Sequence, residues 1–235
     1  ASFREIRQSK GRFIAIVLII MLGTLLFVGV KTAGPVMQKT MDQYVNKGNL
    51  SDLQIISTAG LTDEDIVRAK KTSGVQVETS KQFYYSNTNK NEVVQIFSYD
   101  ASAKQNSLEV VAGRLPKNKN ELVLDEKAKK LGYKIGTTYT IDSDDLKQTS
   151  YKITGFVRSP LFINNLERGY ANVGNGTIDY FIYLPEEDFQ TKIQSVIYLT
   201  FKNVASYDTY SKEYQDKMAQ NQETVEKIFQ GRAEE

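Results

Sequence analysis

The sequence predicts an α+β protein in which a transmembrane helix and a helical stalk carry a domain outside the membrane. Three observations predict this class: an uncharged apolar run near the N-terminus, a strand and helix pattern after it, and a later stretch of mostly strand patterns. The chain has 235 residues, of which 40% are hydrophobic. This is enough for one sizeable core or two modest ones, so composition leaves both arrangements open.

Composition excludes several kinds of chemistry. The chain contains no cysteine and no histidine, which excludes thiolate nucleophiles, disulfides, Cys/His zinc sites and triads with an imidazole base. The formal net charge is +2 and the basic residues are scattered, so we expect no nucleic-acid partner. A hydrolase would need a carboxylate or Ser/Lys mechanism, and no spacing nominates such residues. We therefore expect a protein without catalytic residues, metal or cofactor.

Residues 13–33 predict a transmembrane helix. The stretch from Phe13 to Val30 contains no charge and would span about 27 Å as a helix, close to the thickness of a bilayer's hydrocarbon core. A buried core helix is usually amphipathic, whereas this run is apolar on every face. A cleaved signal peptide is disfavoured because cleavage after Ala33 would place Lys31 where a small residue is needed. We expect an uncleaved anchor.

The flanking charges predict the orientation of this anchor. Residues 1–12 form a basic arm with Arg4, Arg7, Lys10 and Arg12, while only Lys31 closely follows the apolar run. The positive-inside rule then places the N-terminus in the cytoplasm and the main domain outside the cell membrane. The lack of cysteine fits a bacterial exported domain that folds without disulfides.

Two stalk helices are expected, over 34–48 and 206–235. Each has apolar residues spaced by mainly three or four positions, which is typical of a helix seam. The first seam consists of Met37, Met41, Tyr44 and Val45. The second seam includes Tyr207, Tyr210, Tyr214 and Met218. We expect the two seams to pack against each other as a two-helix stalk.

Residues 49–107 predict a small α/β layer. A strand over 51–57 is followed by a helix with Thr62 as its N-cap, and two strand-like runs cover 75–85 and 93–99. Asp65 lies three residues after Thr62, which predicts a capping box. Asp63 and Glu64 complete an acidic first turn, which we interpret as a partner of the helix dipole rather than a catalytic or metal site.

Residues 108–192 predict a mainly β region, with strands in ELVLD, TTYTID, SYKITGFV and DYFIYLP. Asp142, Asp144 and Asp145 lack the glycine and distal glutamate of a calcium loop, so a solvated turn is expected there. The glycine-rich 169–176 segment is not followed by a helix pattern, which disfavours a phosphate site. Residues 193–205 hold an almost continuous apolar run, expected as a central strand that returns to the first layer.

Two loops of the mainly β region are candidates for contact with a partner or cargo, because exposed aromatic and apolar loop residues are plausible recognition points. The first loop is Pro160 to Ile163, with Leu161 and Phe162 as its candidate residues, and the second contains Tyr170, Asn172 and Asn175. The alternative for Leu161 and Phe162 is packing inside the domain. The alternative for the glycine-rich loop is a flexible hairpin without a partner.

The order of these parts resembles the first extracytoplasmic segment of FtsX/MacB-type ABC transporter permeases, particularly the larger forms of Gram-positive bacteria. The matching stretches are REIRQSKGR, GLTDEDI, GRLPKNKNELVLDEKAKKLGYKIG, YKITGFVRSPLFI and DYFIYLPEEDF. Each stretch alone is weakly specific, and the specificity comes from their order and spacing over nearly the whole chain. Thr137 after Gly136 is a departure, since the family often has an acidic residue there.

The resemblance implies a two-lobed extracytoplasmic domain between the first and second membrane helices. One lobe would be α/β (49–107 and 193–205) and the other mainly β (108–192). Proteins of this family do not hydrolyse ATP themselves, but transmit the cycle of a separate ATPase to lipids, lipoproteins, peptides or cell-wall hydrolases. The implied partners are an ABC ATPase subunit, the lipid bilayer, a second permease copy or homologue, and a cargo or external protein.

Because one membrane helix cannot form a permease, we expect the sequence to be a fragment. The alternative is a single-pass anchored sensor or adhesion domain that binds a small ligand or a surface polymer. Its support is the single apolar span and the 14 tyrosines, many of which packing would also explain.

Overall fold

A computed structural model describes residues 10–164 and 166–230 of the chain. The chain divides into two compact units, Ala1–Lys47 and Gly48–Glu235, which are treated separately below. Most of the expected basic arm, residues 1–9, and the GRAEE end lie outside the described residues.

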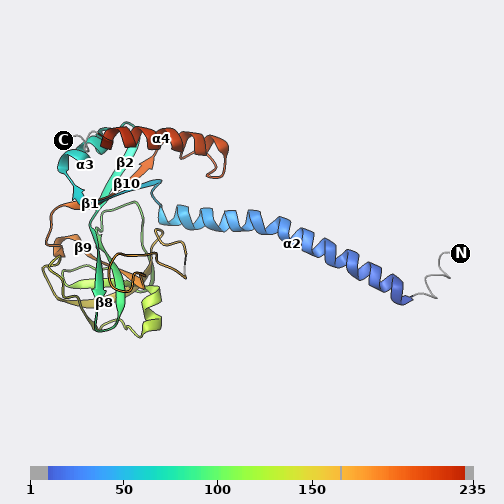
Figure 1. The fold of residues 1–235 in the computed structure, drawn as a ribbon, viewed down its shortest axis with the longest axis horizontal. Helices are drawn as coiled ribbons and strands as arrows, with labels where there is room; N and C mark the ends of the chain where they lie inside the picture. Colours follow the sequence, from blue (N-terminus) through green and yellow to red (C-terminus); the bar gives the residue numbers. More distant parts are fainter. Residues whose placement is uncertain (1–9, 165, 231–235) are drawn as a thin grey trace. The chain divides into compact units, whose positions relative to one another are not determined.

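The first unit contains one long helix, α2 (Lys10–Gly48), of 39 residues (Figure 1). The sequence analysis expected separate helices over 13–33 and 34–48, which is wrong, because α2 continues through Gly34 and Pro35. A proline inside a helix removes one backbone hydrogen bond and need not end the helix. The helix from Ile14 onward is long and apolar enough to cross a membrane, and its apolar window has no buried residue.

The second unit begins with a three-stranded antiparallel sheet in the order β1 (Leu53–Leu61), β10 (Gln194–Phe201), β2 (Val75–Ser80). Helices α3 (Asp63–Lys71) and α4 (Lys212–Gln230) supply apolar side chains to the core on one face of this sheet (Figure 1). Ile197, Leu199 and Phe201 of β10 are buried in that core. The expected central position of the apolar run in β10 is therefore confirmed.

Helix α3 begins with the predicted capping box. The Thr62 hydroxyl accepts a hydrogen bond from Asp65 N at 3.2 Å, and the Asp65 carboxylate accepts one from Thr62 N at 2.8 Å. Glu64 forms an exposed ion pair with Arg68 at 2.7 Å, one helical turn away. Two of the three neighbouring carboxylates thus have partners within the helix, as expected for a stabilised first turn.

Helix α4 differs from the expected second stalk helix. It begins at Lys212, so Tyr207 and Tyr210 of the proposed seam lie in the preceding turn. Asp208 shapes that turn by accepting from Tyr210 N at 2.8 Å, and the Ser211 hydroxyl accepts from Tyr214 N at 3.1 Å. These local side-chain hydrogen bonds favour a turn and a helix start at this point.

The α4 seam covers the three-stranded sheet. Tyr214 and Met218 pack with Val225 against the core of this sheet. This packing keeps the apolar face of a small sheet out of water. Packing of the seam on the segment over 34–48 stays a prediction.

The other sheet has seven strands, six of them in the order β3-β4-β9-β6-β8-β5, with β7 paired to β8. The strands are β3 (Gln82–Asn87), β4 (Glu92–Tyr99), β5 (Glu109–Gly113), β6 (Glu121–Asp125), β7 (Thr138–Thr140), β8 (Ser150–Arg158) and β9 (Tyr180–Pro185). Two short 3₁₀ helices, η1 (Glu126–Leu131) and η2 (Glu186–Asp188), follow β6 and β9. Both faces of this sheet carry buried side chains.

The division between the two expected layers must be corrected. The sequence analysis placed 75–85 and 93–99 together in the α/β layer, yet β3 and β4 belong to the seven-stranded sheet. The chain changes sheet at Ser80 and Lys81, where the Ser98 hydroxyl lies 3.0 Å from the Ser80 hydroxyl and accepts from Lys81 N at 2.9 Å. The strand-like pattern over 75–85 gives no sign of this crossing, because the part that forms β2 and the part that forms β3 have the same local pattern.

The GRLPKNKNE stretch forms a closed loop between β5 and β6. Arg114 donates to both oxygens of the Glu121 carboxylate at 2.8 and 2.6 Å, and Lys117 N donates to the same carboxylate at 2.9 Å. Gly113 has a positive φ of 76°, and a Cβ there would overlap the Thr154 carbonyl. The stretch therefore has a structural role, and its charged pair holds the loop closed.

Replacing Glu121 by Gln is expected to lower the free energy of unfolding by about 2 kcal/mol at pH 7, because it removes charge-assisted hydrogen bonds. The Arg114 hydrogen bonds hold the pKa of Glu121 far below its ordinary value of 4.5. A carboxylate whose pKa is lowered on folding stabilises the folded state at pH values above its pKa in the unfolded chain. The difference in unfolding free energy between wild type and Glu121→Gln should therefore shrink as the pH falls from 4.5 toward about 3. Urea unfolding across this range checks it; a difference independent of pH would contradict it.

Candidate functional site

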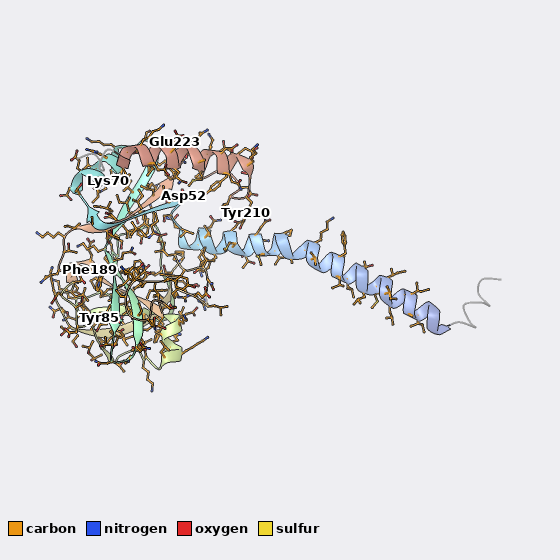
Figure 2. The ribbon with its side chains drawn as sticks, viewed as in Figure 1. Asp52, Lys70, Tyr85, Phe189, Tyr210 and Glu223 are labelled. Carbon is orange, nitrogen blue, oxygen red and sulfur yellow. The ribbon has the colours of Figure 1, made fainter. Side chains whose placement is uncertain are left out.

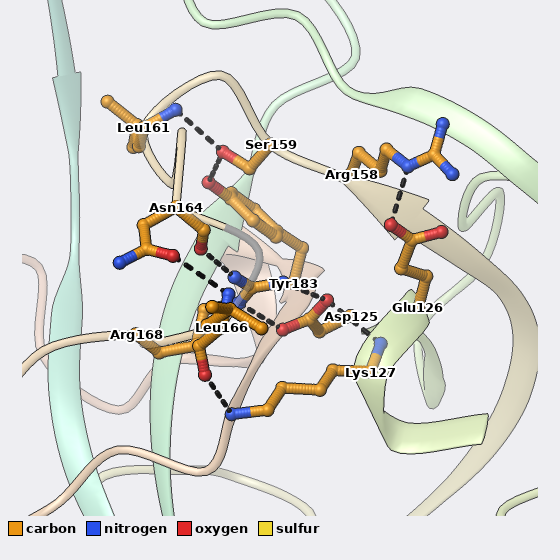
Figure 3. Close-up of polar contacts among 10 residues, drawn as sticks. All are labelled: Asp125, Glu126, Lys127, Arg158, Ser159, Leu161, Asn164, Leu166, Arg168 and Tyr183. Carbon is orange, nitrogen blue, oxygen red and sulfur yellow. Dashed lines mark hydrogen bonds and ion pairs between the residues drawn. The ribbon is translucent and has the colours of Figure 1, made fainter. Parts of the chain in front are cut away.

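The loop after β8 contains the candidate contact residues and is fastened by a buried ion pair (Figure 3). Arg168 donates to Asp125, at the end of β6, at 2.5 and 3.0 Å, and both side chains are almost fully buried. Arg168 also donates to the Asn164 carbonyl. Asp125 is also the N-cap of η1, since its carboxylate accepts a hydrogen bond from Lys127 N at 3.1 Å. One carboxylate thus orders the loop and the helix beside it.

Leu161 and Phe162 are packing residues in this structure. The Phe162 ring stacks on Phe181 of β9 with centroids 4.6 Å apart, and the Arg168 guanidinium lies 5.8 Å from the Phe162 ring. Leu161 packs against the same core. A partner could reach such half-buried side chains only in part. Packing inside the domain therefore describes Leu161 and Phe162 better than contact with a cargo.

The outer part of the loop instead exposes Ile163, Leu166 and Tyr170. Their side chains are 43%, 82% and 78% exposed. Lys127 donates from Nζ to the Leu166 carbonyl at 3.2 Å (Figure 3). Tyr170 forms a backbone bridge with Thr177. Tyr170 and Ile163 lie in stretches that the sequence nominated, whereas Leu166 does not, because the pattern does not reveal which apolar loop residues face inward.

Asn172 and Asn175 lie in the glycine-rich segment, and both are exposed. The Asn175 side chain accepts from Thr177 N at 2.9 Å and donates to the Asn91 carbonyl at 3.5 Å, so it shapes its own turn. Asn172 lies on the wall of a cavity that β1, β3 and β10 also line. Tyr170, Asn172 and Asn175 are therefore the candidates that retain an open surface.

A second feature is the junction where the chain leaves α2 and enters the second unit. We use "junction" for Gly48–Asp52 and the facing residues Lys104–Ser107. The Gly48 and Asn49 carbonyls accept from Ser107 N at 2.7 Å and Asn106 N at 2.9 Å. Asn106 Oδ1 in turn accepts from Ser51 N at 3.0 Å, and Asn49 donates to the Lys104 carbonyl at 2.7 Å.

Asp52, labelled in Figure 2, connects the junction to both the end of β10 and α4. Its carboxylate accepts from Phe201 N at 2.7 Å and from the Tyr214 hydroxyl at 3.4 Å. Burial raises the pKa of Asp52, although both hydrogen bonds oppose the rise. Tyr214 of the expected seam thus has a polar partner beside the chain entry, a role that helical spacing does not predict.

The remaining seam residues lie in α2. Met37 is 74% exposed, whereas Met41, Tyr44 and Val45 are partly buried. Among the residues that the structure describes, no group of three or more acidic side chains could hold a metal ion. The expectation that the chain is not an enzyme stays a prediction.

Comparisons with known proteins give limited information. No protein-family model matches the chain, and the comparison with curated proteins found no match. A similar solved structure is the extracellular domain of the noncanonic ABC-type transporter YknZ from Gram-positive bacteria. The similarity has a TM-score of 0.39 and 16% sequence identity, and covers 69% of this chain and 80% of that chain. A similarity of this size carries no argument about function.

Replacing Arg168 by Met is expected to lower the free energy of unfolding by about 3–5 kcal/mol, because it leaves the Asp125 carboxylate buried without its cation. Urea unfolding at pH 7 measures the loss. The double variant Arg168→Met/Asp125→Asn is the control, since it removes the uncompensated charge but keeps an oxygen for Lys127 N. It should recover part of the loss, and a single variant within about 1 kcal/mol of wild type would refute this account.

Replacing Phe162 by Ser should cost about 2–3 kcal/mol of unfolding free energy, because the stacked ring is lost from a half-buried site. Replacing Leu166 by Ser in the same loop should change stability by less than about 0.5 kcal/mol, because that side chain is exposed. Thermal and urea unfolding of the two variants test the assignment. Equal effects would show that the inward and outward parts of the loop had been assigned wrongly.

Proposed function

We propose that this chain is the first membrane helix and extracytoplasmic domain of an FtsX/MacB-type ABC transporter permease. In this role it transmits ATPase-driven motion across the membrane to export or extract a lipid, lipoprotein or peptide, or to regulate an external partner. Its N-terminus would be cytoplasmic and its main domain extracellular. ATP hydrolysis would belong to a separate ABC ATPase subunit, reached through the rest of a permease.

The observation that carries this proposal is the continuity of α2 up to Gly48. An uninterrupted helix is held by a hydrogen bond at nearly every residue, so a displacement at its membrane end is passed along its axis. At Gly48 the chain enters the junction, where consecutive carbonyls are held by Asn106 and Ser107. Motion of α2 would therefore move β1 rather than be absorbed by a loose linker.

Asp52, the last residue of the first junction segment, supports the same proposal because it contacts segments near the end of the domain. Through Phe201 N and the Tyr214 hydroxyl it contacts the end of β10 and the first turns of α4. In a permease of this type the chain would return to the membrane after α4. The entry and exit segments of the domain would then be coupled by one carboxylate. The order of motifs in the sequence supports the family independently of this geometry.

The first test uses the native polypeptide, tagged in its own cells and purified from their membranes. We expect an intact mass well above 26.6 kDa and co-purification of an ABC ATPase subunit. A polypeptide that matches these 235 residues and brings no ATPase would contradict the proposal. That outcome would favour the anchored sensor or adhesion domain.

A junction variant then tests transmission. Replacing Asn106 by Ala removes the acceptor for Ser51 and a hydrogen bond of about 1 kcal/mol. It should leave ATPase co-purification unchanged and lower the rate of ATP hydrolysis that depends on cargo or external partner. Asn89→Ala, in the exposed turn between β3 and β4, is the matched control. Equal hydrolysis rates for the two variants would mean that the junction does not transmit motion.

A further inference from the structure

A groove in the second unit lies between β1, the outer edge of β3 and the start of β10. Its volume is about 550 Å³, within the range of roughly 300–1,000 Å³ typical of binding sites. Ile56, Tyr84, Phe189 and Ile193 contribute to its walls, together with Asn172 from the glycine-rich loop. Figure 2 labels Phe189, which belongs to the segment following η2.

Strand β3 is at the edge of the seven-stranded sheet, and its backbone orientation can be derived from hydrogen bonds. Ser98 N donates to the Lys81 carbonyl at 2.8 Å, so Lys81 faces β4. The direction alternates along a strand, so Gln82 and Tyr84 face away from β4. The Ser195 hydroxyl confirms this for Gln82, since it contacts both the N–H and the carbonyl of Gln82, at 2.7 and 3.4 Å.

The next outward residue on this edge, Tyr84, therefore directs its backbone N–H and C=O away from the sheet, beside the groove. No strand in the described part of the chain pairs with this edge of β3. An unpaired edge of this kind is a template for another extended chain. Ser195 occupies only the position next to Gln82.

The opposite wall comes from an irregular part of β1. The pairing of β1 with β10 shifts between Ile56 and Leu61, so residues 57–60 bulge out of the regular ladder. Gly60 has a positive φ of 86°, and a Cβ there would overlap the side chain of Ile193. Ile56 and Ile193 both line the groove and remain 55% and 56% exposed, so the groove presents apolar side chains to solvent.

We propose that this groove binds an extended segment of a partner polypeptide, which adds as a strand to the outer edge of β3. The backbone groups of Tyr84 would pair with the peptide backbone, and Ile56 and Ile193 would contact its apolar side chains. A lipid chain fits less well, because it would cover the Tyr84 backbone groups without providing hydrogen bonds. The inference does not depend on the transporter assignment, since it rests only on the edge and the groove.

The experiment uses the full chain in nanodiscs and a phage-displayed library of random linear peptides as the probe. Peptides enriched over empty nanodiscs are synthesised, labelled and titrated by fluorescence anisotropy. Ile193→Asp should weaken binding by about tenfold or more, equivalent to about 1.4 kcal/mol. Val67→Asp, a 44% exposed apolar position on α3 outside the groove, is the matched control and should bind as wild type does.

A second pair of variants tests the backbone contact. Tyr84→Pro removes the outward N–H, which is tolerated on an edge strand because that group is not used in the sheet. It should abolish binding, whereas Tyr84→Val keeps the N–H and should retain part of it. Peptide binding should also slow amide exchange at Tyr84. The proposal is overturned if no peptide is enriched, if Ile193→Asp binds with unchanged affinity, or if exchange at Tyr84 is unaffected by a bound peptide.

Discussion

The seven-stranded sheet depends on burying both faces of β9. Tyr180, Ile182 and Leu184 face one core, while Phe181 and Tyr183 face the other. A strand with no exposed face must have neighbours on both edges and cover on both sides. Strands β4 and β6 pair with the two edges of β9, and the loop carrying Phe162 and Arg168 covers part of one face. The buried Arg168–Asp125 pair follows from this, since it fastens the cover.

Several polar groups that this burial encloses have hydrogen-bond partners. The Tyr180 hydroxyl lies 2.8 Å from the Tyr139 hydroxyl and donates to the Glu92 carboxylate at 2.7 Å. Burial raises the pKa of Tyr180, so its hydroxyl stays neutral and remains a donor. Ser159 pairs with the Tyr183 hydroxyl at 3.0 Å on the opposite face. Tyrosines thus serve as core residues with a polar end, which explains much of the tyrosine content without a ligand.

The features proposed to act lie away from these cores. The junction holds the chain where α2 ends, and the groove lies beside the unpaired edge of β3. The junction is built from backbone groups and the short polar side chains of Asn49, Ser51 and Asn106, whereas the groove combines backbone groups of β3 with apolar side chains such as Ile56 and Ile193. Such features can transmit force or bind a chain without catalytic side chains.

Local features of the fold could be predicted from sequence because they depend on neighbouring residues. The apolar span, the Thr62–Asp65 capping box and the central β10 each follow from patterns within about ten residues. The contact role of the candidate residues stays a prediction. Tyr170, Asn172 and Asn175 are exposed, whereas Leu161 and Phe162 pack against a core of the seven-stranded sheet. The sequence gives no local sign of their partners, Phe181 and Arg168.

The sequence alone therefore determined the membrane-length helix, the positions of most strands and the absence of cysteine and histidine chemistry. Only the tertiary structure decided which sheet each strand joins, as at the crossing from Ser80 to Lys81. It also decided that Tyr214 and Met218 cover a sheet and that Asp125 is paired with Arg168. The physical reason is that periodicity reports which face of an element is apolar, whereas its partner is selected by contacts between residues far apart in the chain.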